Sequence, residues 1–423
     1  MNTAILKSFE TLSQIYSDGA FSTLTLNRTL NACRQQDKAL ITKIVYGVLD
    51  NDIKLNYIIS RHVKKMPKGE TLIFLKIGAY CLMDLSMPVY AVVNDVAELS
   101  KLSGDKRIVG FVNATLKSIA TSVKDFNDYP TDPISRLSVE YSYPEWALKK
   151  LIKDYGLEVA TKIVSSLPDS RTTVRFAEKT DADTVSKKYA VVAEPTAFDD
   201  AFYVKGTLPS DSSEYTAQSL SSMAIARICG NLLQDGSNFL DCCAAPGGKS
   251  VYVKQLRPNV KVTACDVHAH RVNLIESYAS RMGVEIDAHC HDMTEYLPEF
   301  EQAFDVVLTD VPCSGFGVLD TRPDIKLFRQ NVDISELMKL QYAILDNCCK
   351  YVKVGGYIVY STCTVFDNEN GQNIRKFLKE HSNFTYSTIT LPEFQADGKP
   401  YYQFLPHSDG VQGFFVAVIK RTK

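Results

Sequence analysis

Apolar side chains in the first third of the chain recur at helical spacing. In the segment TLIFLKIGAYCLMDL, Leu72, Leu75, Ala79 and Leu82 follow one another at intervals of three and four residues, which places them on one face of a helix. Proline and glycine are sparse in this part of the chain, as is typical of helical bundles. The pattern therefore predicts an all-α domain over residues 1–127.

The pattern becomes irregular after that domain. Residues 128–133 contain two prolines and suggest a linker. The segment YPEWALKKLIKDYG then predicts one more helix, with Pro144 near its first turn and Gly156 at its end. The short β-like runs TTVRF, AVVAE and FYVKG follow. Residues 134–210 are therefore expected to form a small α+β module.

Short apolar strands alternate with helical stretches over residues 211–423. The predicted strands are NFLDCC, KVTACD, EIDAHC, FDVVLTD and GYIVYST, and the helices include HRVNLIESYASRM and ISELMKLQYAILDNCCKYV. This alternation is typical of a Rossmann-like α/β domain, in which helices cover both faces of a mainly parallel sheet. The run GFFVAVIKR is expected to add a last strand at the edge of that sheet.

Composition excludes several classes of protein. The 423 residues are 45% hydrophobic and 23% charged, which is ordinary for a globular chain of two or three domains. Neither a secretory signal nor an apolar run long enough to cross a bilayer is evident. The 11 cysteines include no Cys-x-x-Cys pair, so a disulfide framework or a zinc site is not expected and a reducing cytoplasm fits better.

Charge is unevenly distributed along the chain. The net charge is −2, yet residues 1–125 contain 16 Lys and Arg against 11 Asp and Glu. This surplus of positive charge could contact phosphates. Ordinary solvated helix faces explain it equally well.

Ligands of open α/β sheets bind beyond the carboxyl ends of the strands, so we examined the residues that follow each predicted strand. The first strand leads into this run: Cys243, Ala244, Ala245, Pro246, Gly247, Gly248 and Lys249. Small side chains let the backbone approach a ligand, and the free N–H groups of the next helix suit an anion. A P-loop would need glycine in place of Cys243, and no Gly-x-Gly-x-x-Gly sequence is present. A plain strand-to-helix turn remains an equal alternative.

Acidic side chains follow the next two predicted strands. Asp266 comes 23 residues after Cys243, where an acid typically binds the ribose hydroxyls of a nucleoside. Taken alone, its position is better explained as a cap of the next helix. Asp292, in HCHDM, stands where a side chain can meet an adenine edge.

Two cysteines, Cys313 in DVPC and Cys363 in YSTC, follow two further strands. Cysteines at the ends of two adjacent strands would converge on one cleft. Cysteine is more often a small buried hydrophobe. We interpret four others in that way: Cys242, Cys265, Cys348 and Cys349.

Two thiols in one cleft suit the chemistry of a cytosine ring. Carbon 5 is too poor a nucleophile to take a methyl group directly, but a thiolate that adds to carbon 6 pushes electrons onto carbon 5. A carboxylic group near ring N3, such as Asp310, can stabilise the addition by proton donation or hydrogen bonding. A second thiol can assist loss of the carbon 5 proton, after which the first thiol is eliminated. The nucleophile needs a lowered pKa, because the thiolate is the reactive form.

At these residues the chain resembles the Nop/Sun group of RNA (cytosine-C5) methyltransferases, and more closely the bacterial RsmB-type 16S rRNA enzymes. The strings that carry this resemblance are LDCCAAPGGKS, TDVPCSGFGVLDTRPDIK, YSTCTVFDNEN and DGVQGFFVAVIK. DKALITKIVYGVLDN and GFVNATLK resemble the NusB-type helical RNA-binding domain that RsmB-type enzymes carry. The resemblance covers nearly the whole chain and is weakest over residues 165–215.

The resemblance implies how S-adenosylmethionine is bound as methyl donor, without a metal. Residues 243–249 would form its loop, Asp266 would hold its ribose and Asp292 its adenine side. Asp310 would lie at the reaction centre, beside the donor. The small α+β module would bind RNA or link the domains.

The resemblance also implies the catalytic roles. Cys363 would be the nucleophile and Cys313 the thiol that assists release. On chemistry alone the two roles are interchangeable, because DNA cytosine methyltransferases use a Pro-Cys thiol as nucleophile. Lys249 and Lys326 would contact substrate or order the loops.

The implied reaction is methylation of carbon 5 of a 16S rRNA cytosine, cytosine 967 in the family's bacterial target. The expected protein is a cytoplasmic monomer that binds 16S rRNA or a small-subunit assembly intermediate and no membrane. Alternatives are the same chemistry on another rRNA or tRNA cytosine, and an rRNA-binding assembly factor without activity. Intact Asp310, Cys313 and Cys363 argue against the inactive factor.

Two positions depart from the family pattern. Family members usually have Arg-Val-Asn where this chain has Arg175-Phe176-Ala177, and Gln-Asp where it has Ser213-Glu214. Both lie in parts expected to shape substrate and cofactor contacts. They leave the target open, but not the type of reaction.

Overall fold

The structure, a computed structural model, describes residues 2–19, 22–122, 126–166, 171–209 and 212–423. Its internal contacts divide the chain into two compact units. The helical unit comprises residues 1–165 together with 319–329, and the catalytic unit comprises residues 166–318 together with 330–423. The catalytic unit is so called because it contains the candidate cysteines.

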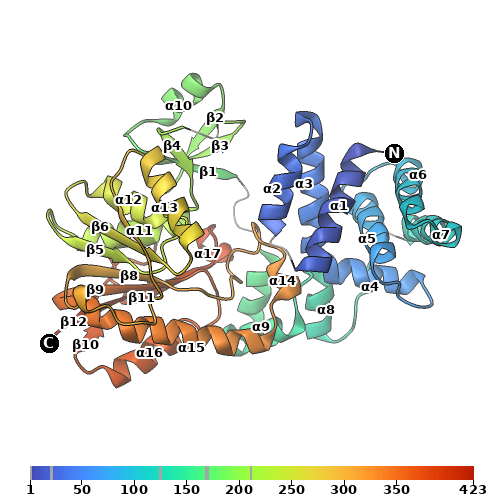
Figure 1. The fold of residues 1–423 in the computed structure, drawn as a ribbon. Helices are drawn as coiled ribbons and strands as arrows, with labels where there is room; N and C mark the ends of the chain where they lie inside the picture. Colours follow the sequence, from blue (N-terminus) through green and yellow to red (C-terminus); the bar gives the residue numbers. More distant parts are fainter. Residues whose placement is uncertain (1, 20–21, 123–125, 167–170, 210–211) are drawn as a thin grey trace. The chain divides into compact units, whose positions relative to one another are not determined.

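Helices form the whole of the helical unit over its described residues (Figure 1). They are α1 (Thr3–Asp18), α2 (Ser22–Asn31), α3 (Gln35–Asp50), α4 (Asp52–His62), α5 (Glu70–Met83), α6 (Val89–Ser100), η1 (Lys101–Ser103), α7 (Lys106–Ser122), α8 (Pro133–Glu140), α9 (Glu145–Ser165) and α14 (Ile325–Phe328). The all-α prediction for this part of the chain is confirmed.

Helix α5 is the centre of this unit. It contacts α1, α3, α4, α6 and α7, and every residue from Ile73 to Leu82 is buried. The predicted helix is confirmed, and its burial extends beyond the predicted face, because a helix surrounded by other helices buries all its sides. Phe74 stacks on Phe9 at its core, with ring centroids 4.7 Å apart.

The segment interpreted as a linker contains neither helix nor strand over residues 128–132, and a helix begins at Pro133. Asp132 is the N-cap of α8, and its side chain accepts a hydrogen bond from the Ser135 amide. Ser142, which follows α8, accepts a hydrogen bond from the Ile53 amide at 2.9 Å. Gly156 interrupts α9 at φ 78°, as expected for a helix stop, but a second helical stretch follows it directly. The contacts therefore extend the helical unit past residue 127, to Ser165.

A small sheet with one helix opens the catalytic unit. Its strands pair antiparallel in the order β2 (Val192–Pro195), β3 (Ala201–Lys205), β1 (Thr172–Phe176) and β4 (Tyr215–Ala217). Helix α10 (Ala182–Tyr189) packs on it through Val185, which belongs to the same apolar cluster as Phe176. This is the predicted α+β module, although β4 lies beyond its expected end at residue 210.

A mixed sheet forms the main part of the catalytic unit. Its elements are α11 (Leu220–Leu232), β5 (Asn238–Asp241), α12 (Gly248–Leu256), β6 (Lys261–Asp266), α13 (Ala269–Arg281), β7 (Asp287–Cys290), η3 (Pro298–Phe300), β8 (Phe304–Asp310), α15 (Asn331–Cys348), η4 (Cys349–Tyr351), β9 (Val352–Thr362), α16 (Gly371–Glu380), β10 (Phe384–Tyr386), β11 (Tyr401–Phe404), α17 (Pro406–Asp409) and β12 (Phe414–Arg421). The strand order is β10-β12-β9-β8-β5-β6-β7, with β11 paired to β12. Strands β5 to β9 run parallel.

Strand β12 does not lie at the edge, contrary to the prediction. It pairs antiparallel with β9 on one side and with β10 and β11 on the other. Its run Phe414–Ile419 is buried throughout, as expected for a strand with neighbours on both sides.

Helices cover both faces of this sheet (Figure 1). Helix α11 belongs to the apolar cluster on one face, and α15 and α16 belong to the cluster on the other. Strand β8 divides its side chains between them, since Leu308 belongs to the first cluster and Val307 to the second. The predicted Rossmann-like architecture is confirmed. Among the described residues, no helix combines the length and apolar character needed to cross a membrane.

Candidate active site

Cys313 and Cys363 meet at the carboxyl end of the sheet. Strands β8 and β9 are parallel neighbours with Asp310 opposite Ser361, so the segments that leave them start side by side. The two Sγ atoms are 3.1 Å apart, and the Cys363 amide donates to the Cys313 sulfur at 3.2 Å. Both side chains are half-buried. The predicted convergence of the two thiols is confirmed.

The surroundings of Cys313 favour its protonated form. A hydrogen bond to Cys363, burial, and negative charge on Cys363 and Glu369 together raise the pKa of Cys313 well above its usual value. At neutral pH Cys313 therefore keeps its proton and can donate it in a hydrogen bond to the Cys363 sulfur. A thiol that donates to a neighbouring sulfur can stabilise a thiolate there.

Asp310 forms an ion pair beside the cysteines. Its Oδ2 accepts a hydrogen bond from Lys249 Nζ at 2.6 Å, and its Oδ1 accepts one from the Ser361 hydroxyl at 2.5 Å. Burial would lower the pKa of Lys249, but the attraction and hydrogen bond of Asp310 outweigh that effect and raise it. Lys249 therefore stays charged, and it orders this side of the cleft.

The segment from Cys243 to Gly247 forms a tight loop between β5 and α12. Gly247 adopts φ 103°, and a Cβ there would lie 3.3 Å from the Cα of Ile275. The loop is braced by Arg271, whose Nη2 donates to the Ala245 carbonyl at 3.1 Å. Glycine thus allows both the backbone turn and the close approach of α13, and the N-terminus of α12 directly follows.

Asp241, a buried carboxylate next to this loop, fits a cationic ligand. Asp241, at the end of β5, is 1% exposed; its Oδ2 accepts a hydrogen bond from Ser250, while its Oδ1 accepts none of ordinary geometry from the described residues. Burial raises the pKa of Asp241 to about 7. A ligand that places a positive charge in the adjacent loop would offset the cost of burying the ionised Asp241. The sulfonium and ammonium groups of S-adenosylmethionine meet this requirement.

Asp266 is the last residue of β6, and Asp292 follows the end of β7, the neighbouring parallel strand. Asp266 is buried, its Oδ1 accepts from the His268 amide at 3.2 Å, and its Oδ2 lies 3.4 Å from Arg271. The N-cap of α13 is His268, not Asp266. Asp292 is exposed, and hydrogen bonds from the amide and hydroxyl of Thr294 lower its pKa, so it is ionised at neutral pH. The positions suit ribose and adenine contacts.

Other candidate residues lie elsewhere. Lys326 belongs to the helical unit, where its buried ammonium donates to the backbone carbonyl of Asp50 at 2.7 Å and to its carboxylate at 2.5 Å. The predicted roles of Lys326 were contact with substrate or ordering of the loops, and this contact fits the second. The cysteines interpreted as buried hydrophobes are all buried: Cys242, Cys265, Cys348 and Cys349.

Three residues of the site were missed in the sequence. Two of them had a signal in the sequence. Asp241 is an acid at the end of an apolar strand, and Arg271 is a cation five residues after Asp266. The third, Glu369, lies in the matched string YSTCTVFDNEN, but its contacts join segments that are far apart in the chain. Without those contacts nothing in the sequence distinguishes it from a surface acid.

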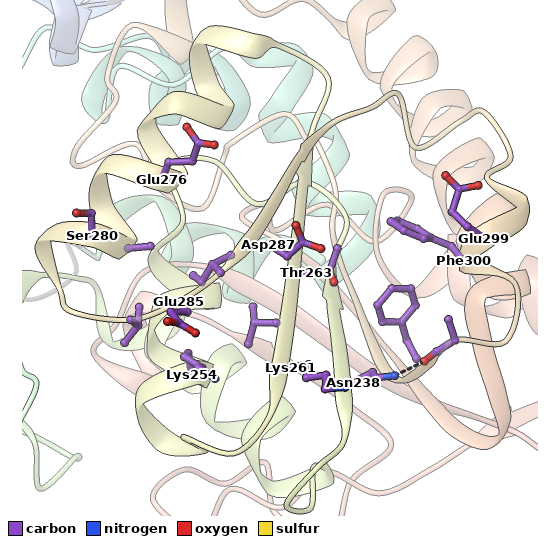
Figure 2. A pocket seen from close by; sticks show the side chains of 16 residues that line it. Asn238, Lys254, Lys261, Thr263, Glu276, Ser280, Glu285, Asp287, Glu299 and Phe300 are labelled. Atoms are coloured by element: carbon purple, nitrogen blue, oxygen red, sulfur yellow. Dashed lines mark hydrogen bonds between the residues drawn. The ribbon is translucent and has the colours of Figure 1, made fainter.

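A shallow pocket of about 860 Å³ lies at the opposite end of the sheet (Figure 2). Its lining includes the first residues of four strands, Asn238, Lys261, Asp287 and Phe304. None of the cysteines or carboxylates described above lines it. It is therefore separate from the candidate active site.

Known proteins match both units of the chain. Residues 231–420 match the family described as 16S rRNA methyltransferase RsmB/F, and residues 5–121 match the NusB family. The chain is 34% identical to the probable ribosomal RNA small subunit methyltransferase B of Bacillus subtilis (strain 168), over 98% of each chain. It is 30% identical to the ribosomal RNA small subunit methyltransferase B of Enterobacter sp. (strain 638), over 90% of each chain.

Solved structures share the fold. The crystal structure of PH0851 has a TM-score of 0.81 at 20% identity and covers 99% of this chain, which covers 98% of that one. The structure of NSun6 from Pyrococcus horikoshii with SFG has a TM-score of 0.57 at 19% identity, over 66% of this chain and 98% of that one. Full-length sequence relatives and the matching families lead to one conclusion: the chain belongs to the RsmB/F family of 16S rRNA methyltransferases and is an S-adenosylmethionine-dependent RNA methyltransferase with a NusB-family domain at its N-terminus.

Proposed function

We propose that this enzyme methylates carbon 5 of a cytosine in 16S rRNA, the counterpart of cytosine 967, through a covalent bond between Cys363 and carbon 6. The observation that carries this proposal is the 3.1 Å separation of the Cys313 and Cys363 sulfur atoms. The names of the Bacillus and Enterobacter relatives support ribosomal RNA of the small subunit as the substrate.

The two cysteines divide the chemistry between them. The Cys363 thiolate adds to carbon 6, and carbon 5, now nucleophilic, accepts the methyl group. Once the Cys363 sulfur is bonded to carbon, its charge no longer raises the pKa of Cys313, although burial and the charge of Glu369 still do. Cys313 then releases its proton to water and, as a thiolate, takes the proton from carbon 5. The electron pair of that C–H bond restores the 5,6 double bond and expels the Cys363 thiolate.

Asp310 and Lys249 stabilise the addition as a pair. Both carboxylate oxygens of Asp310 already accept hydrogen bonds, so Asp310 is held as an acceptor. The charged Lys249 beside it provides an N–H donor toward the negative charge that develops around ring N3. Of the two expected modes of action for Asp310, proton donation or hydrogen bonding, the proposal keeps hydrogen bonding, through its partner Lys249.

S-adenosylmethionine, when bound, supplies an electrophilic methyl group on a sulfonium. The loop 243–247 and the N-terminal amides of α12 would hold its amino-acid part, with Asp241 opposite the positive charge. Asp266 would accept hydrogen bonds from the ribose hydroxyls and Asp292 from the adenine amine. These carboxylates come from the ends of three neighbouring strands, β5, β6 and β7.

The substrate has to offer an unstacked cytosine. Base pairing and stacking cover the ring faces in a duplex, so the target lies in a loop or is flipped out. The NusB-family domain and its surplus of basic residues are suited to bind 16S rRNA or a small-subunit assembly intermediate in the cytoplasm. We propose that the enzyme acts as a monomer.

The cysteine roles are tested by single substitutions with labelled S-adenosylmethionine and small-subunit RNA. Cys363→Ala should abolish methyl transfer, and Cys313→Ala should accumulate a covalent protein–RNA adduct visible on a denaturing gel. Cys290→Ala, an exposed cysteine at the end of β7, is the matched control and should behave as wild type. Adduct in Cys363→Ala would reverse the assignment, and normal transfer by that variant would exclude the mechanism.

The target is tested in cells. Bisulfite mapping of rRNA and tRNA from a strain that lacks this protein should show one missing methylcytosine in 16S rRNA. Loss of a mark in another rRNA or a tRNA would move the same chemistry to that substrate. If no mark is lost and purified protein transfers no methyl group to any RNA, the assembly-factor alternative holds instead.

A further inference from the structure

Glu369 places a fully buried carboxylate behind the two cysteines. It lies seven residues after the end of β9 and is 0% exposed. Its Oε1 accepts a hydrogen bond from the Ser314 hydroxyl at 2.6 Å, and its Oε2 accepts two at 2.9 Å, from the Ser314 amide and from Gln341 Nε2. One carboxylate thus binds the β8–α14 loop and helix α15 together.

The partners of Glu369 are the immediate neighbours of the cysteines. Ser314 follows Cys313, and Gln341 Nε2 also donates to the carbonyl of Pro312 at 2.9 Å, so the backbone is held on both sides of Cys313. The Ser314 hydroxyl shares a hydrogen bond of 2.7 Å with Thr364, which follows Cys363. The network therefore reaches the residue next to each thiol.

The network is itself rigidly supported. The Tyr360 hydroxyl donates to the Glu369 carbonyl at 2.6 Å, and Asn373 Nδ2 donates to Gln341 Oε1 at 3.0 Å. Ser314, Gln341, Thr364 and Asn373 are all buried. Hydrogen bonds to an ionised group are strong in such an environment, because few water molecules compete for the donors. The two sulfur atoms, 3.1 Å apart, lie on the segments that this network joins.

We propose that Glu369 is a positioning residue, which holds Cys313 against Cys363 so that Cys313 can assist release of the methylated base. It contacts no reacting atom and acts through Ser314 and Gln341. The inference rests on the proposed division of labour between the two cysteines. The negative charge of Glu369 also contributes to the raised pKa of Cys313.

The test uses two substitutions of Glu369 in the full-length protein. Glu369→Ala removes the acceptors and frees the loop. It should lower kcat for methylation about 100-fold, the lower end of the range for general acid–base assistance, with KM values for RNA and S-adenosylmethionine within about threefold of wild type. Because addition by Cys363 remains possible while release is slowed, this variant should accumulate the covalent protein–RNA adduct. A general folding defect would reduce adduct instead.

Glu369→Gln separates charge from shape. Its amide oxygen can still accept from the Ser314 amide, and its NH₂ group can donate to the Ser314 hydroxyl while that hydroxyl donates to Thr364. The fall in kcat should therefore be smaller than in Glu369→Ala, about 10-fold or less. This variant keeps the test open if Glu369→Ala does not fold. Glu380→Ala is the matched control, since Glu380 is an exposed carboxylate of α16 that accepts a hydrogen bond from Tyr342 on α15.

A second measurement needs no RNA. Alkylation by iodoacetamide, read by mass spectrometry, should modify Cys363 before Cys313 in wild type and in Glu380→Ala, but both at similar rates in Glu369→Ala. Wild-type kcat, or lower kcat without adduct and with an unchanged order of alkylation, would overturn the role of Glu369. If the wild-type protein did not methylate RNA, the proposed function would be refuted. The alkylation result would then still test whether Glu369 positions Cys313.

Discussion

Replacement of Asp241 by asparagine tests whether the buried acid beside the cofactor loop destabilises the catalytic unit. Burial raises the pKa of Asp241 from 3.8 to about 7. An acid with a higher pKa in the folded state destabilises the fold as pH rises above the unfolded value, and the cost is complete above the folded value. The difference corresponds to about 4 kcal/mol at pH 8. At pH 5 the cost is about 2 kcal/mol, because the folded state is then protonated.

Asparagine carries no charge and can keep the hydrogen bond from Ser250. Its NH₂ group would take the place of Oδ1, which accepts no hydrogen bond of ordinary geometry from the described residues, and an unpaired buried donor costs about 1–3 kcal/mol. We therefore expect Asp241→Asn to be about 1–3 kcal/mol more stable than wild type at pH 8. At pH 5 the advantage should vanish or reverse.

Calorimetry of both proteins at pH 5 and pH 8 measures this difference. In a unit of this size, 1 kcal/mol shifts Tm by roughly 2–4 °C, so the expected gain at pH 8 is readily resolved. Asp235→Asn, at an acid in the turn before β5, is the control and should show no comparable dependence on pH. An Asp241→Asn effect that is the same at both pH values, or a loss of stability at pH 8, would refute the reasoning. The variant should also bind S-adenosylmethionine more weakly despite its greater stability.

Two further substitutions separate the cofactor site from the helical unit. Asp266→Asn should raise the Kd for S-adenosylmethionine about 10-fold or more in isothermal titration, because a charged acceptor for the ribose is lost; unchanged affinity would contradict the ribose assignment. Lys326→Met removes the buried donor to Asp50 and should cost the helical unit about 1–3 kcal/mol in calorimetry, with unchanged affinity for S-adenosylmethionine. Loss of methylation at full stability would instead support contact of Lys326 with substrate.

Local patterns in the sequence were sufficient for many of the strands and for the type of chemistry, although β4, β10 and β11 were not predicted. Strands β1, β6 and β8 have the bounds that TTVRF, KVTACD and FDVVLTD predicted, because apolar β-prone runs bounded by polar residues carry their own signal. The meeting of Cys313 and Cys363 was also predictable, since parallel neighbours bring their carboxyl ends to the same edge.

Properties that depend on neighbours distant in sequence were not predictable. The run GFFVAVIKR was recognised as a strand, but its interior place follows from pairing with β9, β10 and β11. Helix α5 showed a periodic apolar face, although the surrounding helices bury its other sides as well. The helical unit extends to Ser165 because α8 and α9 contact it, a relation that composition at residues 128–133 does not contain.

The same division applies to the active site. The sequence by itself determined which residues stand at the strand ends, and therefore the two thiols, the loop 243–249 and the acids Asp266, Asp292 and Asp310. Only the tertiary structure decided what surrounds them: the buried, incompletely bonded Asp241, the Lys249 partner of Asp310, and the contact of Glu369 with Ser314 across 55 residues. Burial and pairing set pKa values and positions, and both arise only when distant segments of the chain pack together.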